Sequence, residues 1–399
     1  MKTPPPIKSG ERRVTSGFSL IEVLVGLLIG MLSVVVIMQV FGAFEGNKRS
    51  TTGGDDAQIN GTIALYGLER DVREAGYGLN NFNLLGCSLS YTTTGTKKVA
   101  VKLSALAPVV INSPNVPAGD NNTDTLLIVF GNSNSPAEGD LISTAPSTGS
   151  YPITTPTSFA VDDAVIAQPA LRPTDCALTL DKVKAITNTV LTVDPGTTSG
   201  LALGSVVFNL GQAPITKQPF TARAYRVRSG NLTVCDYVEN DCGNDANKSD
   251  DTIWVPVASN IVSLRAQYGR DTTATSLSGA VGQYDQITPG KDDGLGFPVQ
   301  CSWARTLAVR VAIVARSGQF TKYDAASGEA PSTSKAPVWA GSVADTKSVP
   351  SNPTAVTFDL SSNAEWKNYR YKKLETTVPI RNMVWQGSQG TQQGGSGGC

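Results

Sequence analysis

The sequence predicts an α+β fold, in which one long N-terminal helix precedes a large β-rich, antiparallel-sheet domain. Two observations predict this fold class. The chain is apolar from Phe18 to Phe44 except for one acid, Glu22, over a length typical of a membrane helix. From about residue 79 onward it consists of short β-branched or alternating runs, separated by Gly, Pro, Asn and Asp clusters. That is the pattern of strands and turns.

The N-terminal segment joins a basic leader, residues 1–17, to an apolar helix, residues 18–44. At a rise of ~1.5 Å per residue this helix would span about 40 Å, more than the ~30 Å hydrocarbon core of a bilayer. Four basic residues against one acid in the leader hold it on the cytoplasmic side. A secretory signal peptide is cleaved after its apolar run, whereas here the small residue Gly17 comes before it. Cleavage at Gly17 would therefore leave the apolar helix on the mature chain. On topology alone, an ordinary N-terminal anchor is the alternative.

Glu22 is the one charged residue of the apolar segment. An ionisable side chain at the centre of a membrane costs roughly 2.5–3.5 kcal/mol on insertion scales, so it is expected to have a function and a partner. If the chain is cut after Gly17, Glu22 becomes the fifth residue of the mature protein. It could then face the α-amino group of Phe18, in its own chain or in a neighbouring subunit.

The run from Gly17 to Val25, GFSLIEVLV, resembles the class III signal of type IV prepilins. This resemblance implies that a prepilin peptidase cuts after Gly17 and methylates the new N-terminal residue, Phe18. It also implies that Glu22 sets the register of this helix against a neighbouring subunit in a filament.

Residues 45–78 are predicted to continue the helix in amphipathic form. The stretch Glu45–Gly54 is polar and carries a Gly doublet, where the helix is expected to bend, fray or restart. Beyond it, helical spacing produces two apolar lines, Ile59/Ile63/Tyr66 and Leu65/Leu68/Val72. A Gly-Tyr-Gly sequence from residue 76 is expected to end the helix. In prepilin-like proteins this half of the helix packs on a β-sheet, so the resemblance implies a pilin-like fold.

Residues 79–386 are expected to form the β-rich periplasmic or extracellular domain, and residues 387–399 a flexible Gly-rich tail. Four segments low in large apolar residues, 112–124, 131–157, 271–299 and 322–353, are predicted surface loops. The predicted strands are Val99–Leu103, Thr125–Phe130, Ala177–Ile186, Val190–Val193, Ser205–Leu210, Ala222–Arg228, Leu232–Val238, Thr252–Val257, Ile261–Tyr268, Leu307–Arg316, Val356–Leu360 and Tyr369–Val378.

The chain has six cysteines, an even number in a region expected to face an oxidising compartment, which favours disulfides. Cys235 and Cys242 are the first expected pair, because the loop between them is short and rich in Gly, Asn and Asp. Cys87 with Cys176 and Cys301 with Cys399 are further candidate pairs among several connectivities. Cys399 could instead be free or form an intermolecular bond.

Composition argues against catalysis and against nucleic-acid binding. The chain has no histidine, which excludes Ser-His-Asp and Cys-His nucleophile pairs and the usual zinc and iron sites. We therefore expect no enzyme activity. Basic and acidic residues balance at 33 each, without a basic run beyond the leader, so no nucleic-acid partner is predicted.

One acidic loop is a weak candidate for Ca²⁺, and no other cofactor is expected. Asp241, Asp245, Asn247 and Asp250 lie close together in sequence, and oxygen ligands of this kind suit Ca²⁺. The spacing does not fit an EF-hand, however, and a solvated turn is the alternative interpretation.

Three further stretches, 68–77, 262–269 with 307–317, and 369–385, resemble PilW-type minor pilins of the type IV pilus. The resemblance implies a protein of the bacterial inner membrane, with its C-terminal domain periplasmic, that primes pilus assembly within a complex of minor pilins and then lies at the pilus tip on the cell surface. Its partners would be the prepilin peptidase, other minor pilins, the major pilin, a large tip adhesin and membrane lipid. The Gly-rich extension to Cys399 departs from the family pattern. The alternatives are a pseudopilin of a type II secretion system and a membrane-tethered extracytoplasmic binding module.

Overall fold

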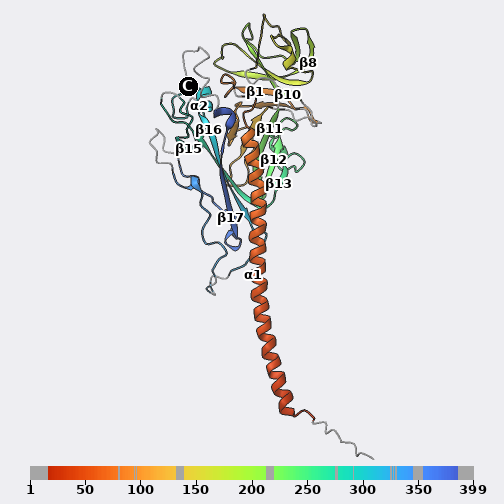
Figure 1. Ribbon diagram of the computed structural model, residues 1–399, viewed down its shortest axis with the longest axis vertical. Coiled ribbons are helices and arrows are strands. Elements are labelled where there is room, and N and C mark those ends of the chain that lie inside the picture. Colours follow the sequence, from red (N-terminus) through yellow and green to blue (C-terminus); the bar gives the residue numbers. More distant parts are fainter. Residues whose placement is uncertain are drawn as a thin grey trace, which may run out of the picture. The chain divides into compact units, whose positions relative to one another are not determined.

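The computed structural model describes residues 17–79, 81–93, 95, 97–131, 139–212, 220–274, 277–290, 292–323, 326, 328, 330–344 and 354–384. The chain divides into two compact units, residues 1–52 and residues 53–399. An N-terminal apolar helix is followed by a large domain of mainly antiparallel sheets (Figure 1), so the predicted α+β fold class is confirmed. The predicted leader, apart from Gly17, and the Gly-rich tail lie outside the described residues.

The first helix, α1 (Leu20–Glu74), is 55 residues long and includes the boundary between the two units. It is helical through the Gly doublet at residues 53 and 54, so the restart predicted there does not occur. Each glycine costs a helix roughly 1 kcal/mol, which a long helix tolerates because every added residue adds a backbone hydrogen bond. Gly76, with φ +78°, follows the helix in the left-handed conformation expected beyond a helix C-terminus.

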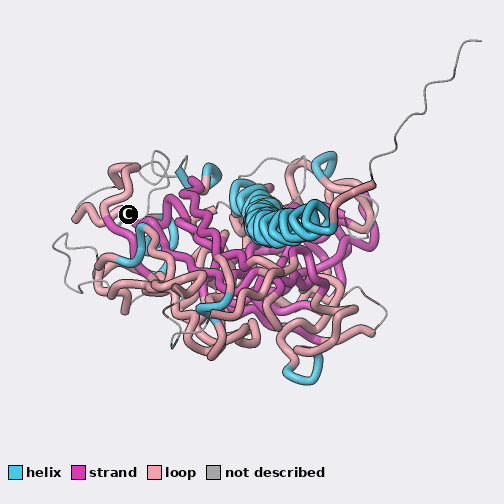
Figure 2. The backbone as a smooth tube through the Cα atoms, turned by 90° about the horizontal axis from the view of Figure 1, so that it is seen from below, coloured by secondary structure: helices cyan, strands magenta, loops and turns pink. Residues whose placement is uncertain are grey.

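Two antiparallel sheets form the part of the domain that contacts the second half of α1. One has the order β13-β12-β11-β4-β3 and the other β15-β14-β16-β17. Their strands are β3 (Val109–Ile111), β4 (Leu126–Phe130), β11 (Thr221–Arg228), β12 (Asn231–Asp236), β13 (Val255–Ala258), β14 (Ile261–Arg270), β15 (Gln283–Asp285), β16 (Thr306–Arg316) and β17 (Tyr371–Pro379). Two short helices, α2 (Val299–Ala304) and α3 (Arg381–Val384), flank β16 and β17 in the sequence. In Figure 2 the strands, together with the loops that join them, make up most of the domain.

The third sheet has the order β2-β1-β8-β7-β10-β5, with β6 paired to β9 and β9 paired to β8. Within it β1 and β8 are parallel, an exception to the otherwise antiparallel pairing. Its strands are β1 (Ser88–Thr92), β2 (Ala100–Leu103), β5 (Asp140–Leu141), β6 (Ser150–Pro152), β7 (Asp163–Gln168), β8 (Ala177–Thr187), β9 (Val190–Asp194) and β10 (Val206–Gln212).

Residues 139–212, here called the inserted module, interrupt a hairpin of the main domain. Phe130 at the end of β4 pairs with Thr221 at the start of β11, so the chain leaves and re-enters the sheet at one point. The module has a hydrophobic cluster of its own, which includes Tyr151, Val165 and Leu191. Because a domain insertion needs adjacent ends, this position lets the module fold without disturbing the sheet.

The predicted strands match the structure closely, with three corrections. Residues 356–360 form no strand, although Val356, Phe358 and Leu360 are buried against Trp339. The alternation of apolar and polar residues in this segment therefore reflects the burial of every second side chain, without the hydrogen bonding of a β-strand. The predicted loop 131–157 contains β5 and β6, and the predicted loop 271–299 contains β15. Sequence reasoning also missed the strands β1, β3 and β7.

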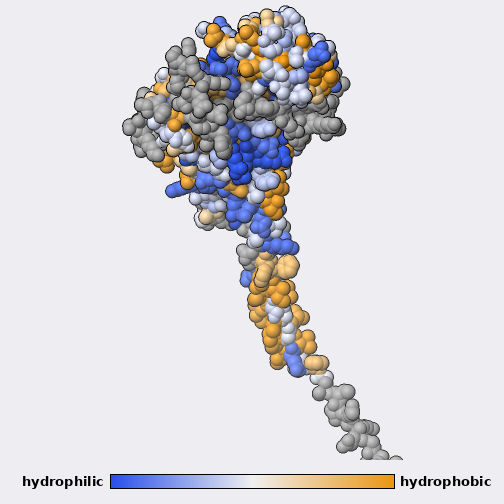
Figure 3. All heavy atoms as spheres, turned by 45° about the horizontal axis from the view of Figure 1, so that its top comes forward, coloured by the Kyte–Doolittle hydropathy of each residue, from blue (hydrophilic) through white to orange (hydrophobic). Residues whose placement is uncertain are grey.

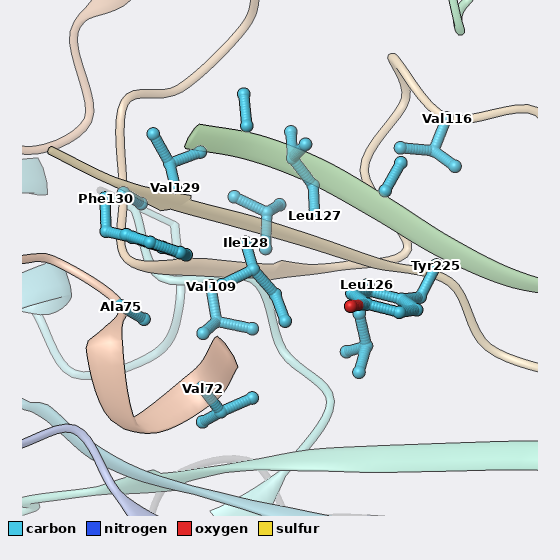
Figure 4. Close-up of a cluster of buried hydrophobic side chains, with 14 of the residues drawn as sticks. Val72, Ala75, Val109, Val116, Leu126, Leu127, Ile128, Val129, Phe130 and Tyr225 are labelled. Carbon is cyan, nitrogen blue, oxygen red and sulfur yellow. The ribbon is translucent and has the colours of Figure 1, made fainter. Parts of the chain in front are cut away.

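The core lies between α1 and the sheets. Val72 and Ala75 at the end of the helix lie beneath Val109 and Ile128 of β3 and β4 (Figure 4). Earlier in the helix, a Cβ added at Gly61 would collide with Leu374 of β17. The absence of a side chain there allows the helix backbone to approach the sheet closely.

Candidate assembly site

The apolar stretch of α1 exposes its side chains in every direction. All large apolar side chains from Phe18 to Phe44 are exposed, and this surface appears as the hydrophobic part of the helix in Figure 3. By length and composition, Leu20–Gly42 is the one helix in the described chain that could cross a membrane. So large an apolar surface is unfavourable in water at ~25 cal/mol per Å². Contact with lipid or with other apolar helices would remove this surface from water.

The three residues of the predicted processing and assembly site lie together at the start of this helix. Gly17 and Phe18 precede the first turn, and Phe18 is 84% exposed. The backbone carbonyl of Ser19 accepts hydrogen bonds from the N–H groups of Glu22 and Val23, at 3.0 and 3.2 Å. This bonding begins the helix. The Glu22 side chain lies in the exposed first turn.

The second half of α1 uses only one of its two predicted apolar lines for the domain. Leu68 and Val72 are fully buried, and Leu65 packs against the same core. By contrast, Ile59 is 58%, Ile63 56% and Tyr66 68% exposed. We call these three residues the exposed stripe. The sheets cover one side of the helix and leave a second apolar line uncovered.

A buried carboxylate anchors the end of α1 to the sheet. Asp71 is completely buried, and its carboxylate accepts hydrogen bonds from the Arg223 guanidinium at 3.0 Å and the Tyr225 hydroxyl at 2.6 Å. The amide of Asn382 donates to the carbonyls of Glu74 and Ala75 at 3.2 and 3.0 Å. Sequence reasoning did not single out Asp71. Its position beside Val72, on the buried side of an amphipathic helix, was the available signal.

Among the described residues, two disulfides are seen in the domain, and both are among the pairs expected from the sequence. Cys235 and Cys242 are joined across a short loop. Cys87 and Cys176, 89 residues apart, link the segment before β1 to the inserted module. The suggested Cys301–Cys399 pair includes a residue outside the described part of the chain.

The acidic loop suggested for Ca²⁺ uses its polar groups locally. The Asp241 carboxylate accepts from the side-chain amide of Asn244, and its backbone carbonyl accepts from the amide of Asn247. The Asp250 carboxylate accepts from the N–H and the hydroxyl of Thr252. These hydrogen bonds hold the pKa of Asp250 below its usual value. Among the described residues no group of three or more His, Cys, Asp or Glu side chains could hold a metal ion.

Residues 234–382 match the family model of type IV pilus-assembly protein W, PilW. The matched stretch begins in β12 and ends in α3. It therefore contains the four-stranded sheet and leaves out α1 and the inserted module. Comparisons with curated proteins and with solved structures found no match.

Proposed function

We propose that this chain, whose residues 234–382 match the PilW family model, takes part in type IV pilus assembly as a minor pilin. In this proposal a prepilin peptidase cuts after Gly17, and the helix from Phe18 holds the subunit in the inner membrane. The subunit then joins other minor pilins in a complex that primes the filament. That complex, with the major pilin added beneath it and a large adhesin bound to it, would lie at the pilus tip.

The observation that carries this proposal is the uncovered apolar surface of α1. A simple anchor needs an apolar stretch only as long as the bilayer is thick. Here the exposed stripe, Ile59/Ile63/Tyr66, lies well beyond the last residue of the candidate membrane span, Gly42. An apolar line of this kind on an amphipathic helix suits a groove between neighbouring subunits.

The processing step is tested by mass spectrometry of the N-terminal peptide, from sheared filaments and from membranes separately. We expect a peptide that begins at N-methylated Phe18 in the filament fraction. A chain that still begins at Met1 would contradict the proposal and leave a membrane-tethered domain. The processed peptide in membranes alone, together with loss of protein secretion in a deletion strain, would instead favour the type II secretion pseudopilin.

The assembly step is tested with Glu22→Ala and with the double substitution Ile59→Gln/Ile63→Gln. Both should leave cleavage largely intact and reduce the recovery of partner pilins with the affinity-tagged protein. Thr62→Ser, at an exposed position of the same helix, is the matched control. Normal recovery of partners with both variants would contradict a role of these residues in assembly.

A further inference from the structure

A pocket of about 450 Å³ opens at one end of the four-stranded sheet. Its wall combines the loop around Asp120 and Asn121, the start of β14, the end of β16, the start of β17 and the loop around Asp359. Pockets of ~300–1,000 Å³ are typical of small-molecule sites. None of its lining residues belongs to α1.

Two carboxylates are fixed on one part of the wall. Both oxygens of Asp120 accept backbone N–H groups, from Ser229 at 2.9 Å and Gly230 at 2.8 Å. Asp359 accepts from the N–H of Ser361 at 2.9 Å and from the Asn122 amide at 3.0 Å. The hydrogen bonds from Ser361 lower the pKa of Asp359. Each carboxylate oxygen keeps a further lone pair, so the two groups are preorganised acceptors.

A cation faces the same pocket without a carboxylate partner. The Arg316 guanidinium lies over the Tyr369 ring, 4.5 Å from its centroid. Its Nε is buried and has no hydrogen-bond partner, and it makes no ion pair with a carboxylate in the described chain. Because Arg316 lines the pocket, its guanidinium can donate hydrogen bonds to a ligand there.

Apolar groups complete the wall. Val262, Leu360 and Tyr371 line the pocket beside the polar groups. A simple anion would be repelled by the two carboxylates, and a simple cation would be repelled by the guanidinium. A neutral ligand that both donates and accepts hydrogen bonds, with an apolar side, matches all three kinds of group.

We propose that this pocket binds a carbohydrate of about disaccharide size. Sugar hydroxyls would donate to Asp120 and Asp359 and accept from Arg316 and the Asn121 amide, while the apolar face of a sugar ring would pack on Tyr371 and Val262. This inference does not depend on the proposed role in pilus assembly.

The test is titration of the full-length protein, in lauryldimethylamine oxide micelles that carry no sugar headgroup, with maltose, lactose and N,N′-diacetylchitobiose. Binding is followed by saturation-transfer-difference NMR and calorimetry. We expect at least one disaccharide to bind, and Asp359→Asn and Asn121→Ala each to weaken that binding by roughly tenfold or more. Both positions are exposed, so both variants should fold.

Asp250→Asn is the matched control. Asp250 is also exposed and accepts the N–H two residues on, at 2.8 Å, as Asp359 does, but it does not line the pocket. The Asp250→Asn protein should bind the disaccharide with the same affinity as the unmodified protein. Binding by none of the disaccharides would overturn the proposal, as would binding that Asp359→Asn and Asn121→Ala leave unchanged. Free lysine or glutamate, binding in place of the sugars and sensitive to the same two variants, would also overturn it.

Discussion

The inserted module and the surrounding domain bury carboxylates in different ways. Outside the module the buried acids meet arginines: Asp71 meets Arg223, Asp124 meets Arg265, and Asp285 and Asp293 share Arg270. Inside the module the buried acids meet neutral donors. Asp181 accepts from the Tyr151 hydroxyl, Asp163 from the Asn209 amide and Asp140 from the Thr155 N–H.

This chain therefore stabilises buried charge by two mechanisms, which differ in how much stability is lost when one partner is removed. A buried ion pair is costly to assemble, but removal of one partner is much more costly, because a charge is left without compensation. A carboxylate held by neutral donors loses only part of its hydrogen bonding when one donor is removed. Substitution of one partner residue should therefore cost more stability in the main domain than in the module.

The largest effect is expected from Arg270→Met. Arg270 and its partner carboxylates are almost completely inaccessible, and the guanidinium contacts Asp285 at 2.6 Å and Asp293 at 3.1 Å. Burial of the two carboxylates without the cation should destabilise the domain by roughly 3–5 kcal/mol. Tryptophan fluorescence during urea unfolding of the full chain in detergent reports this value, because all five tryptophans lie outside the module.

Tyr151→Phe is the comparison inside the module. It removes the hydroxyl that donates to Asp181 at 2.7 Å, at an expected cost of about 1–3 kcal/mol. Hydrogen exchange of β7 and β8 measures this loss of stability, since the module contains no tryptophan. An equal or larger loss for Tyr151→Phe than for Arg270→Met would contradict the comparison.

An intermediate effect is expected from Asp71→Asn, which keeps the shape of the side chain and removes its charge. Arg223 is one-third exposed, so water compensates part of the loss, and the cost should be about 1.5–3 kcal/mol. Faster hydrogen exchange should appear in the last turns of α1 and in β11, with the module unchanged. Glu69→Gln, at an exposed ion pair on the same helix, is the matched control and should cost less than about 1 kcal/mol. Equal effects of the two variants would show that Asp71 is no anchor.

The sequence predicted the features that are local in the chain. The apolar helix after Gly17 is a continuous pattern, and most strands show their period of two. The ion pairs could not be predicted in this way, because Asp71 and Arg223 are 152 residues apart and only the packing of α1 on β11 brings them together. The pocket has the same origin, since Asp120 and Asp359 come from opposite ends of the domain sequence. The segment 356–360 shows the converse, a correct burial pattern without a strand.

The smallest effect, and the one specific to the module, concerns pH. Burial raises the pKa of Asp181, and the nearby Asp194 adds to this, against the hydrogen bonds from Tyr151 and Gly196. A group whose pKa is raised in the folded state contributes stability below its unfolded pKa, near ~3.9. That contribution is lost as the pH rises through the folded value. Asp181→Asn should therefore stabilise the module relative to the unmodified protein at neutral pH, by about 1.4 kcal/mol for each unit of displacement. Near pH 4 the gain should vanish or reverse.

Hydrogen exchange of β8, compared between the two proteins at both pH values with correction for the intrinsic exchange rate, measures the difference. A difference that is independent of pH would show that Asp181 has the same pKa in the folded and unfolded chain, and that its neutral donors compensate its burial completely.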